Sequence, residues 1–427
     1  MKTITEHFVT SIKWNTLEAC LYQAIFWGYH ITLFSTFDRA FYGTVGILFS
    51  LLYIGVTLFT LGLDSALSPF IRQFTESKAS FRNLLGQQCT LNIITYCGLA
   101  LLGGFYDINI FFKHFGIPLL DHSTIMILIF LLIIESAKKT IKTFLGLLFY
   151  NQKLATLEIA YITLYVFTVA TLYHAKIPMT LSVIFLPMLI YSTVMLILLI
   201  ALLYHPYHQL PDIPYQHKPD LSKRIFYSRI FGYINQLGHL IFSGNILVVF
   251  FAAQQGISYA ALAKIISTTM QSISTITQKI IGQTSEAALA HAHAYATDEK
   301  KSLFSLANNY AQAVILCLFT FLCIINYQTI ATHAINGTIQ TNAMLLTFSI
   351  LLLVEPFFLT YEKRYLIEEK GRYLSYYHLT MIGLFAFWIY CDCVYPLLFL
   401  LCLTAVRIAW YSVLGMIQLL NINSSSL

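Results

Sequence analysis

Charged residues are scarce in this sequence. Asp, Glu, Lys and Arg make up only 10% of its 427 residues, whereas about 25% is usual in a soluble domain. Hydrophobic residues make up 58%, and the mean hydropathy is +0.70. A soluble enzyme and a disordered chain are therefore both excluded.

Several motifs are missing as well. No P-loop pattern GxxxxGK(S/T) occurs, so ATP hydrolysis within this chain is not expected. The net charge is +6, but no basic cluster or zinc-type spacing accompanies it, so nucleic acid is not expected as a partner. No signal-peptide cleavage site follows the polar start at residues 1–10, so the first apolar segment is expected to stay in the protein.

What the sequence does contain is a series of long apolar segments. A membrane-spanning helix takes about 20 such residues, and the pattern predicts an all-α polytopic membrane protein with about twelve transmembrane helices. These helices are predicted near residues 12–36, 43–71, 84–106, 123–148, 154–172, 179–204, 225–251, 257–281, 303–326, 341–360, 373–390 and 395–418.

Lys and Arg are unequally distributed between the predicted connections. Nineteen fall on one side of the membrane or just inside its helix ends, and only Arg39, Lys113 and Lys176 fall on the other. Because basic residues in short loops mark the cytoplasmic side, we expect a multi-pass protein with both termini in the cytoplasm.

A proline-rich stretch divides the chain into two halves of similar length. Residues 204–220 hold Pro206, Pro211, Pro214 and Pro219, and proline does not continue a helix. We therefore predict an N-terminal six-helix lobe at 1–203, a cytoplasmic linker at 204–220 and a C-terminal six-helix lobe at 221–427. Both lobes begin in the cytoplasm, as parallel repeats do.

The predicted helix at 257–281 carries a polar stripe. Lys264, Thr268, Gln271, Thr275 and Lys279 share one face of a 3.6-residue repeat. Ionisable side chains at membrane depth usually face the protein interior or a water-filled cavity, so the stripe is expected to line an aqueous cavity. Close helix packing is the alternative; it explains the hydroxyls but not the lysines, although Lys279 can snorkel.

Arg407 falls near the middle of the last predicted span. A guanidinium at that depth can bind a phosphate bidentately, or it can form an internal ion pair with Glu355, Glu135 or Glu158. Glu135 is followed by Lys138, Lys139 and Lys142 one or two turns further on and can pair with these lysines instead.

Another group of polar residues lies in the predicted helix at 225–251. These residues can extend the lining of the same cavity, or they can make hydrogen bonds to neighbouring helices. They are Asn235, Gln236, His239, Ser243 and Asn245. Glu18 and His30 in the first helix are further intramembrane candidates.

No metal or cofactor site is predicted. His291 and His293 are two residues apart, so their imidazoles would diverge on a helix. Cys391 and Cys393 form an isolated pair, which is weak support for metal or redox chemistry.

The predicted outward-facing connections are short, the longest running from about residue 107 to 122. A membrane glycosyltransferase or polysaccharide polymerase normally needs a sizeable outer loop or domain to hold an acceptor and to place catalytic groups. The short connections argue against an enzyme of that kind, so the function is expected to lie within the membrane.

Two regions of the sequence resemble a known transporter family. Tyr42-Gly43 with residues 61–67 and 69–71, and residues 245–247 with 256–265, are similar to motifs of the polysaccharide (O-antigen type) flippases. That family belongs to the multidrug/oligosaccharidyl-lipid/polysaccharide exporter (MOP) superfamily. The resemblance implies two lobes around a central cavity and alternating access for a lipid-linked oligosaccharide.

The sequence also departs from the family pattern. Ser243-Gly244-Asn245 stands where the family often has an Asp, and Gly282-Gln283 stands where a Pro is common. If that Asp serves ion coupling in relatives, this chain either lacks such coupling or uses another acid, such as Glu18 or Glu355.

The resemblance and the residues together predict a flippase for undecaprenyl-diphosphate-linked oligosaccharide in the cell inner membrane. Lys264 and Arg407 are expected to bind the diphosphate, and the other polar residues of the two helices to contact sugar. Expected partners are membrane lipid, Na⁺ or H⁺, and polysaccharide-assembly proteins. The rivals are a cation-coupled drug exporter of the same fold, a membrane glycosyltransferase or polymerase, and a scramblase or assembly scaffold.

Overall fold

The structure is a computed structural model of the 427-residue chain. It describes most of the chain outside residues 295–361 and the C-terminal region. The described residues are 4–62, 66–105, 112–113, 117, 119–213, 219–241, 243–277, 279, 284–294, 362–369, 371–391 and isolated positions between 402 and 416.

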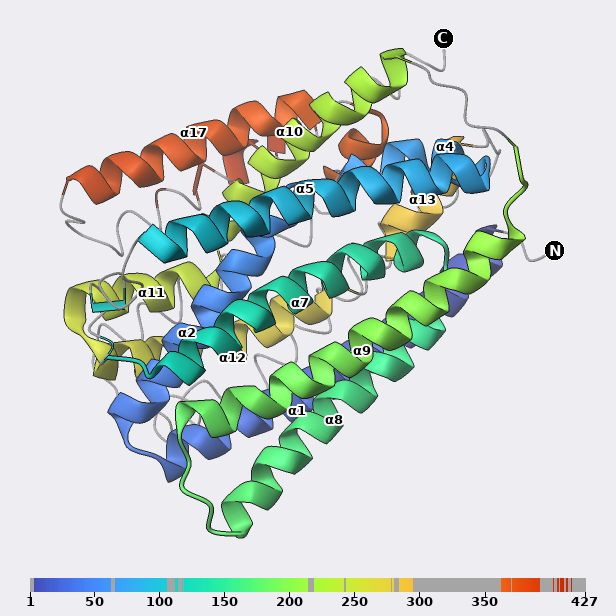
Figure 1. Ribbon diagram of the computed structural model, residues 1–427. Helices are drawn as coiled ribbons and strands as arrows, with labels where there is room; N and C mark the ends of the chain where they lie inside the picture. The colour runs from blue at the N-terminus through green and yellow to red at the C-terminus, as the bar shows by residue number, and fades with distance from the viewer. Residues whose placement is uncertain are drawn as a thin grey trace.

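All regular elements in these ranges are helices (Figure 1). The N-terminal half contains the long helices α1 (Ile4–Thr36), α2 (Arg39–Phe59), α5 (Lys78–Phe105), α7 (His122–Leu147), α8 (Asn151–His174) and α9 (Leu181–Gln209), with the short η1 (Ser68–Phe70) and α4 (Ile71–Thr75) between α2 and α5. The C-terminal half contains α10 (Pro219–Ile241), α11 (Gly244–Gln255), α12 (Ile257–Thr277), α13 (Thr284–Ala294), a helical turn at 362–367 and α17 (Gly371–Tyr390).

Side-chain caps set the start of several long helices. Asp38 accepts a hydrogen bond from the backbone N–H of Phe41 at 2.8 Å, and Thr180 accepts one from Val183 at 3.3 Å. Such caps satisfy backbone donors that the first helical turn leaves without partners. They explain why the predicted span 43–71 begins four residues earlier, at Arg39, and why α9 begins at Leu181.

The predicted span 43–71 ends twelve residues too late. The helix α2 stops at Phe59, because Leu61 and Gly62 have φ angles of 49° and 73°, which lie in the left-handed region and interrupt a right-handed helix. The chain becomes helical again at η1, where the ring of Pro69 fixes φ. Proline lacks a backbone N–H, but at the start of a helix that group would have no helical partner.

Other boundaries also differ from the sequence prediction: α1 begins at Ile4 rather than near 12, α5 at Lys78 rather than near 84, and α10 at Pro219 rather than near 225. Pro206, expected in the linker, lies inside α9, which continues to Gln209. A proline in the last turn of a helix removes a single hydrogen bond and so can be tolerated there. The predicted span 225–251 is two helices, α10 and α11, whose axes differ by 56°.

The helices α2 and α12 lie at the centre of the packing. Every residue from Tyr42 to Ser50 is buried, because α2 packs against α7 on one side and against α11 and α12 on the other. The helix α12 also packs on α1, and α13 packs on α1 and η1. One hydrophobic core therefore runs through both halves, while α1, α8 and α9 lie side by side and α10 lies beside α17 (Figure 1).

Three of the described helices, α2, α8 and α9, are long and apolar enough to cross a membrane, and the bent pair of α10 and α11 makes a fourth if it is counted as one span. The spans predicted at 303–326 and 341–360 lie outside the described residues, and the span at 395–418 is described only at isolated positions.

Candidate functional site

Lys264 lies in the first half of α12, and its ammonium group faces α2 and α11. Its Nζ donates hydrogen bonds to Oγ of Ser50 and to Oδ1 of Asn245, both at 3.2 Å. Gly46 makes room for the side chain, because a Cβ at that position would lie 2.8 Å from Cγ of Lys264. Lys264 is 3% exposed, so protein atoms enclose it in this structure and it does not face an open cavity.

The remaining members of the stripe follow Lys264 along α12 in different environments. Thr268 is buried and Thr275 is half-buried, whereas the side chain of Gln271 lies outside the described part of the chain. Lys279 does not snorkel away from the protein; it forms an ion pair with Glu18 of α1. The structure thus brings Lys279 and Glu18 together, and it brings Lys264 and Asn245 together.

Among the described residues, the N-terminal half contains three buried or half-buried glutamates that pair with lysines, and Glu18 is one of them. Lys138 Nζ lies 2.8 Å from Oε1 of Glu135, so Lys138 is the partner among the three lysines that the sequence offered. Glu158 of α8 forms an ion pair with Lys142 of α7. Glu135 and Glu158 therefore have lysine partners already. Arg407, for which they were possible partners, and Glu355, the third possible partner of Arg407, lie outside the described residues.

The polar residues of α10 contact neighbouring helices. Oδ1 of Asn235 accepts a hydrogen bond from Ser375 of α17 at 3.2 Å. Oε1 of Gln236 accepts one from the backbone N–H of Gly62 at 3.1 Å. For Asn235 and Gln236 the structure thus shows hydrogen bonds between helices, one of the two alternatives that the sequence left open. His239 lies 3.2 Å from Glu362, measured from Nε2 to Oε2.

His291 and His293 diverge on α13, as expected. Nε2 of His291 lies 2.9 Å from the carbonyl oxygen of Leu147 and the imidazole packs on Phe149, whereas His293 is exposed. Burial lowers the pKa of His291 below its usual range, since a low-dielectric environment disfavours the charged imidazolium. Cys391 is exposed, and Cys393 lies outside the described residues.

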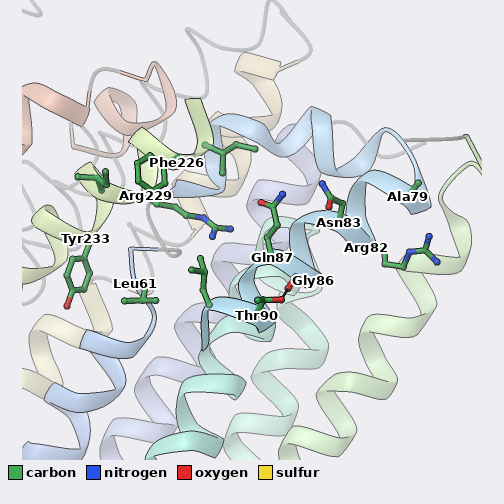
Figure 2. Close-up of a pocket in the computed structure, with 13 residues that line it drawn as sticks. Leu61, Ala79, Arg82, Asn83, Gly86, Gln87, Thr90, Phe226, Arg229 and Tyr233 are labelled. Carbon is green, nitrogen blue, oxygen red and sulfur yellow. Dashed lines mark hydrogen bonds between the residues drawn. The ribbon is translucent and has the colours of Figure 1, made fainter. Parts of the chain in front are cut away.

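A cavity of about 970 Å³ lies between α5 of the N-terminal half and α10 of the C-terminal half. Its walls are the first part of α5, the first part of α10 and the end of α2 (Figure 2). Its polar lining consists of Arg82, Asn83, Gln87, Thr90, Arg229 and Tyr233, and its apolar lining includes Leu61, Leu91, Ile225, Phe226 and Ile230. Among the described residues, no carboxylate lines this cavity.

Arg229 is the most unusual group in the cavity wall. It extends from α10 toward α5, the helix that carries Asn83 and Gln87, while Arg82 lies nearer the start of α5 and farther from Arg229 (Figure 2). Arg229 is 8% exposed, and its Nε and Nη2 have no hydrogen-bond partner among the described residues. A buried guanidinium with open donors is costly, so the arrangement suits an anionic ligand.

Sequence reasoning missed Arg229 and Arg82 as site residues. Both residues counted only as positive charge near the cytoplasmic ends of predicted spans. The position of Arg229 within the predicted span 225–251 was a usable signal. The sequence could not show that α5, from the other half of the chain, forms the facing wall of the cavity.

Comparison with solved structures identifies the fold of the chain. No protein-family profile matches the chain, and no curated protein matches it in sequence. Solved structures do match: MATE in complex with MaL6, at a TM-score of 0.70 and 12% identity, covers 99% of this chain and 97% of its own. An outward-facing MATE multidrug-resistance transporter of the MOP superfamily matches at 0.65 and 12% identity, with 100% and 97% covered.

A third match is a MOP superfamily transporter from Pyrococcus furiosus, described as having a binding pocket of reverse polarity that suggests a different function. Its TM-score is 0.64 at 10% identity, and the match covers 100% of this chain and 97% of that one. These similarities confirm the predicted all-α, multi-helix class. The chain has the fold of the MATE transporters of the MOP superfamily.

Proposed function

We propose that the chain is a flippase that moves undecaprenyl-diphosphate-linked oligosaccharide from the inner to the outer leaflet of the cell inner membrane. The observation that carries the proposal is the cavity between α5 and α10, which has two arginines and no carboxylate among its described lining residues. A site of that charge favours an anionic headgroup over the cationic compounds expected for a drug exporter.

The diphosphate matches the donors of Arg229. A guanidinium presents its N–H groups in a planar fork that fits two phosphate oxygens, and Nε and Nη2 of Arg229 are free of other hydrogen bonds within the described part of the chain. Asn83 and Gln87 on the opposite wall offer amides for sugar hydroxyls. The headgroup would therefore find Arg229 on one wall, and the neutral amides together with Arg82 on the other.

The cavity size supports a headgroup ligand. Small-molecule sites usually measure about 300–1,000 Å³, and this cavity measures about 970 Å³. A diphosphate with a few sugar rings is of that scale, whereas a long polyprenyl chain is not. We infer that the lipid tail stays in the bilayer, because leaving it in hydrocarbon costs nothing while exposing it to water does.

The position of the cavity suggests how transport begins. Under the predicted topology, the first turns of α5 and α10 lie on the cytoplasmic side, where the headgroup is assembled. At the opposite end, α2 and α12 are in close contact: a Cβ on Gly43 would lie 2.3 Å from the carbonyl oxygen of Ile257. The proposal is that the headgroup first binds near Arg229 and then moves to Lys264 and Arg407 when the halves rearrange.

Other parts of the proposal come from the sequence. Glu18 and Glu355 are the proposed acids for Na⁺ or H⁺ coupling, and Gln271, Thr268, Thr275, Asn235, Gln236, His239 and Asn245 are proposed to contact sugar during passage. Both termini are proposed to be cytoplasmic, and polysaccharide-assembly proteins are the proposed partners. Glu18 has Lys279 as its partner here, so coupling would require this pair to separate.

A binding experiment tests the cavity. The purified chain is titrated with a short-chain polyprenyl diphosphate that carries one N-acetylhexosamine. Loss of one charge-assisted hydrogen bond costs about 1.5–3 kcal/mol, so Arg229→Gln should bind about 10- to 100-fold more weakly. Arg72→Gln is the matched control, since Arg72 is exposed on α4 and does not line the cavity. Equal affinity in all three proteins would overturn the proposal.

A cation-coupled drug exporter is the second candidate. Two observations favour it: a MATE multidrug-resistance transporter shares the fold, and three glutamates, Glu18, Glu135 and Glu158, lie inside the N-terminal half. An exporter of this kind should expel ethidium from proteoliposomes along an ion gradient. Ethidium export without diphosphate-sugar binding would establish this candidate in place of the flippase.

A further inference from the structure

Three side chains with metal-binding atoms converge in the C-terminal half. His239 lies in the last turn of α10, Glu362 begins the helical turn at 362–367, and His378 lies in the second turn of α17. Nε2 of His239 is 3.2 Å from Oε2 of Glu362, and one ligand atom from each residue lies within 4.8 Å of the other two. The two imidazole centroids are 4.9 Å apart.

The spacing of these atoms suits a tetrahedral ion. Zinc binds imidazole nitrogen and carboxylate oxygen at about 2.0–2.2 Å, which places neighbouring ligand atoms about 3.3–3.5 Å apart at tetrahedral angles. The distance between His239 and Glu362 is already close to that value. Bringing the third atom from the present limit of 4.8 Å requires a shift of about 1.5 Å at most, which side-chain rotation can supply.

The surroundings hold the three ligands in place. Glu362 and His378 are 4% and 1% exposed. The imidazole of His378 packs directly on the backbone of α10, because a Cβ on Gly238 would lie 1.9 Å from its Nδ1. One turn earlier, Oγ of Ser375 donates to Oδ1 of Asn235 at 3.2 Å. The packing of α17 on α10 thus fixes His378 relative to His239.

The charges of the group also fit a divalent cation. A carboxylate as buried as Glu362 is stable only when it is paired or bound to a metal. One partner of this carboxylate is Nε2 of His239, at 3.2 Å. Two neutral imidazoles and one carboxylate are the ligand set of several zinc sites, in which water or another ligand takes the fourth position.

We propose that His239, Glu362 and His378 form a binding site for a transition-metal dication, with Zn²⁺ as the best fit. Imidazole ligands exclude Na⁺, Mg²⁺ and Ca²⁺ as preferred occupants, since those ions favour oxygen. His239 leaves one side open, because about a third of its side chain is exposed (31%). A bound ion would join the end of α10, just before the bend into α11, to α17 and to residue 362.

The first test measures metal binding to the intact chain. Untagged protein in detergent is stripped with chelator, equilibrated with ZnCl₂ and analysed for zinc by mass spectrometry. One Zn²⁺ per chain is expected, with at least about 100-fold weaker binding in His378→Gln and Glu362→Gln. His174→Gln is the control, because His174 is exposed at the end of α8. Equal zinc binding in all four proteins would overturn the proposal.

The second test needs no variant and so does not depend on how a variant folds. Co²⁺ is titrated into the chelator-treated wild-type protein, and its visible ligand-field bands are recorded. A saturable spectrum of tetrahedral intensity that Zn²⁺ abolishes is expected. If only the weak octahedral spectrum of aqueous Co²⁺ appears, the cluster is a histidine–glutamate ion pair without a metal, and the proposal fails.

Discussion

Gln236 of α10 accepts a hydrogen bond from the backbone N–H of Gly62, at 3.1 Å between Oε1 and N. The two residues belong to different halves of the chain, and Thr60 lies near the same amide oxygen at 3.4 Å. The contact sits beside Leu61, which lines the cavity. The turn that follows α2 and the last third of α10 therefore meet beside the proposed headgroup site, and a rearrangement that separated these two segments would break this bond.

Gly62→Ala should weaken this contact strongly. A Cβ at Gly62 would lie 2.4 Å from both the carbonyl oxygen of Arg229 and the amide nitrogen of Tyr233, and the φ angle of 73° disfavours any side chain. We expect a lower melting temperature and a loss of about 1–3 kcal/mol, measured by thermal unfolding in detergent. Gly28→Ala is the control, since no atom lies within 4 Å of its Cβ position; equal stability of the two variants would contradict the close approach.

Lys264→Met separates the role of the ammonium group from that of its packing. Methionine keeps a long unbranched side chain against Gly46 but cannot donate to Ser50 or Asn245. We expect folded protein at normal levels and at least about a tenfold loss of lipid-linked oligosaccharide transport, which corresponds to one lost charge-assisted contact. Lys153→Met, at an exposed position of α8, should transport normally. Wild-type transport by folded Lys264→Met would remove Lys264 from the pathway.

Glu18 and Lys279 should be coupled in stability. The two side chains are 5% and 17% exposed, and removing one partner of a buried ion pair typically costs about 3–5 kcal/mol because the other charge is left behind. Glu18→Gln should therefore destabilise the fold more than Glu18→Gln combined with Lys279→Met. Chemical unfolding of the four proteins in a double-mutant cycle measures this coupling. Additive effects would show that the ion pair does not contribute.

Asp121 gives a prediction about pH. Hydrogen bonds from the hydroxyls of Ser123 and Thr124 lower the pKa of Asp121 from 3.8 to about 2, and Asp121 also caps α7 through the backbone N–H of Thr124 at 3.1 Å. Because the pKa is depressed by folding, the ionised cap stabilises the protein above pH 4 and loses that effect as the pH falls toward 2.

Two substitutions at Asp121 separate capping from titration. Asp121→Ala should lower stability at neutral pH by about 1 kcal/mol, and Asp121→Asn should keep most of the cap while flattening the pH dependence between 4 and 2. Thermal unfolding across this pH range is the measurement. An unchanged acid response in Asp121→Asn would show that another group controls it.

Several helix positions were predictable from the sequence alone. The prediction 123–148 became α7 at His122–Leu147, and 373–390 became α17 at Gly371–Tyr390. Polar residues that cap the helix or lie at the membrane surface bound each of these apolar runs, so the sequence marks both ends of the helix. The end of α2 at Phe59 was missed because most of residues 61–71 are still apolar despite Asp64 and two serines. The break depends on a left-handed turn at Leu61 and Gly62.

The candidate site was only partly predictable. Lys264, Glu18 and His239 were recognised because each is polar in an apolar segment, but their partners Asn245, Lys279 and Glu362 follow from tertiary packing. His378 and Glu362 show no ligand spacing in the sequence, because they are brought to His239 by the packing of separate helices. Arg229 was counted only as a charge that marks topology, and the second role proposed for it is supported by its burial and its place in the cavity wall.

The central claim is that a cationic cavity between the halves takes the diphosphate headgroup for translocation. The most direct measurement is the movement of a fluorescent undecaprenyl-diphosphate oligosaccharide across proteoliposomes, followed by its protection from an added membrane-impermeant quencher. Wild type and Arg72→Gln should equilibrate the lipid between leaflets at the same rate, and Arg229→Gln should be at least about tenfold slower, as expected for one lost charge-assisted contact. Equal rates in folded wild type and Arg229→Gln, or no movement above protein-free vesicles, would contradict the account.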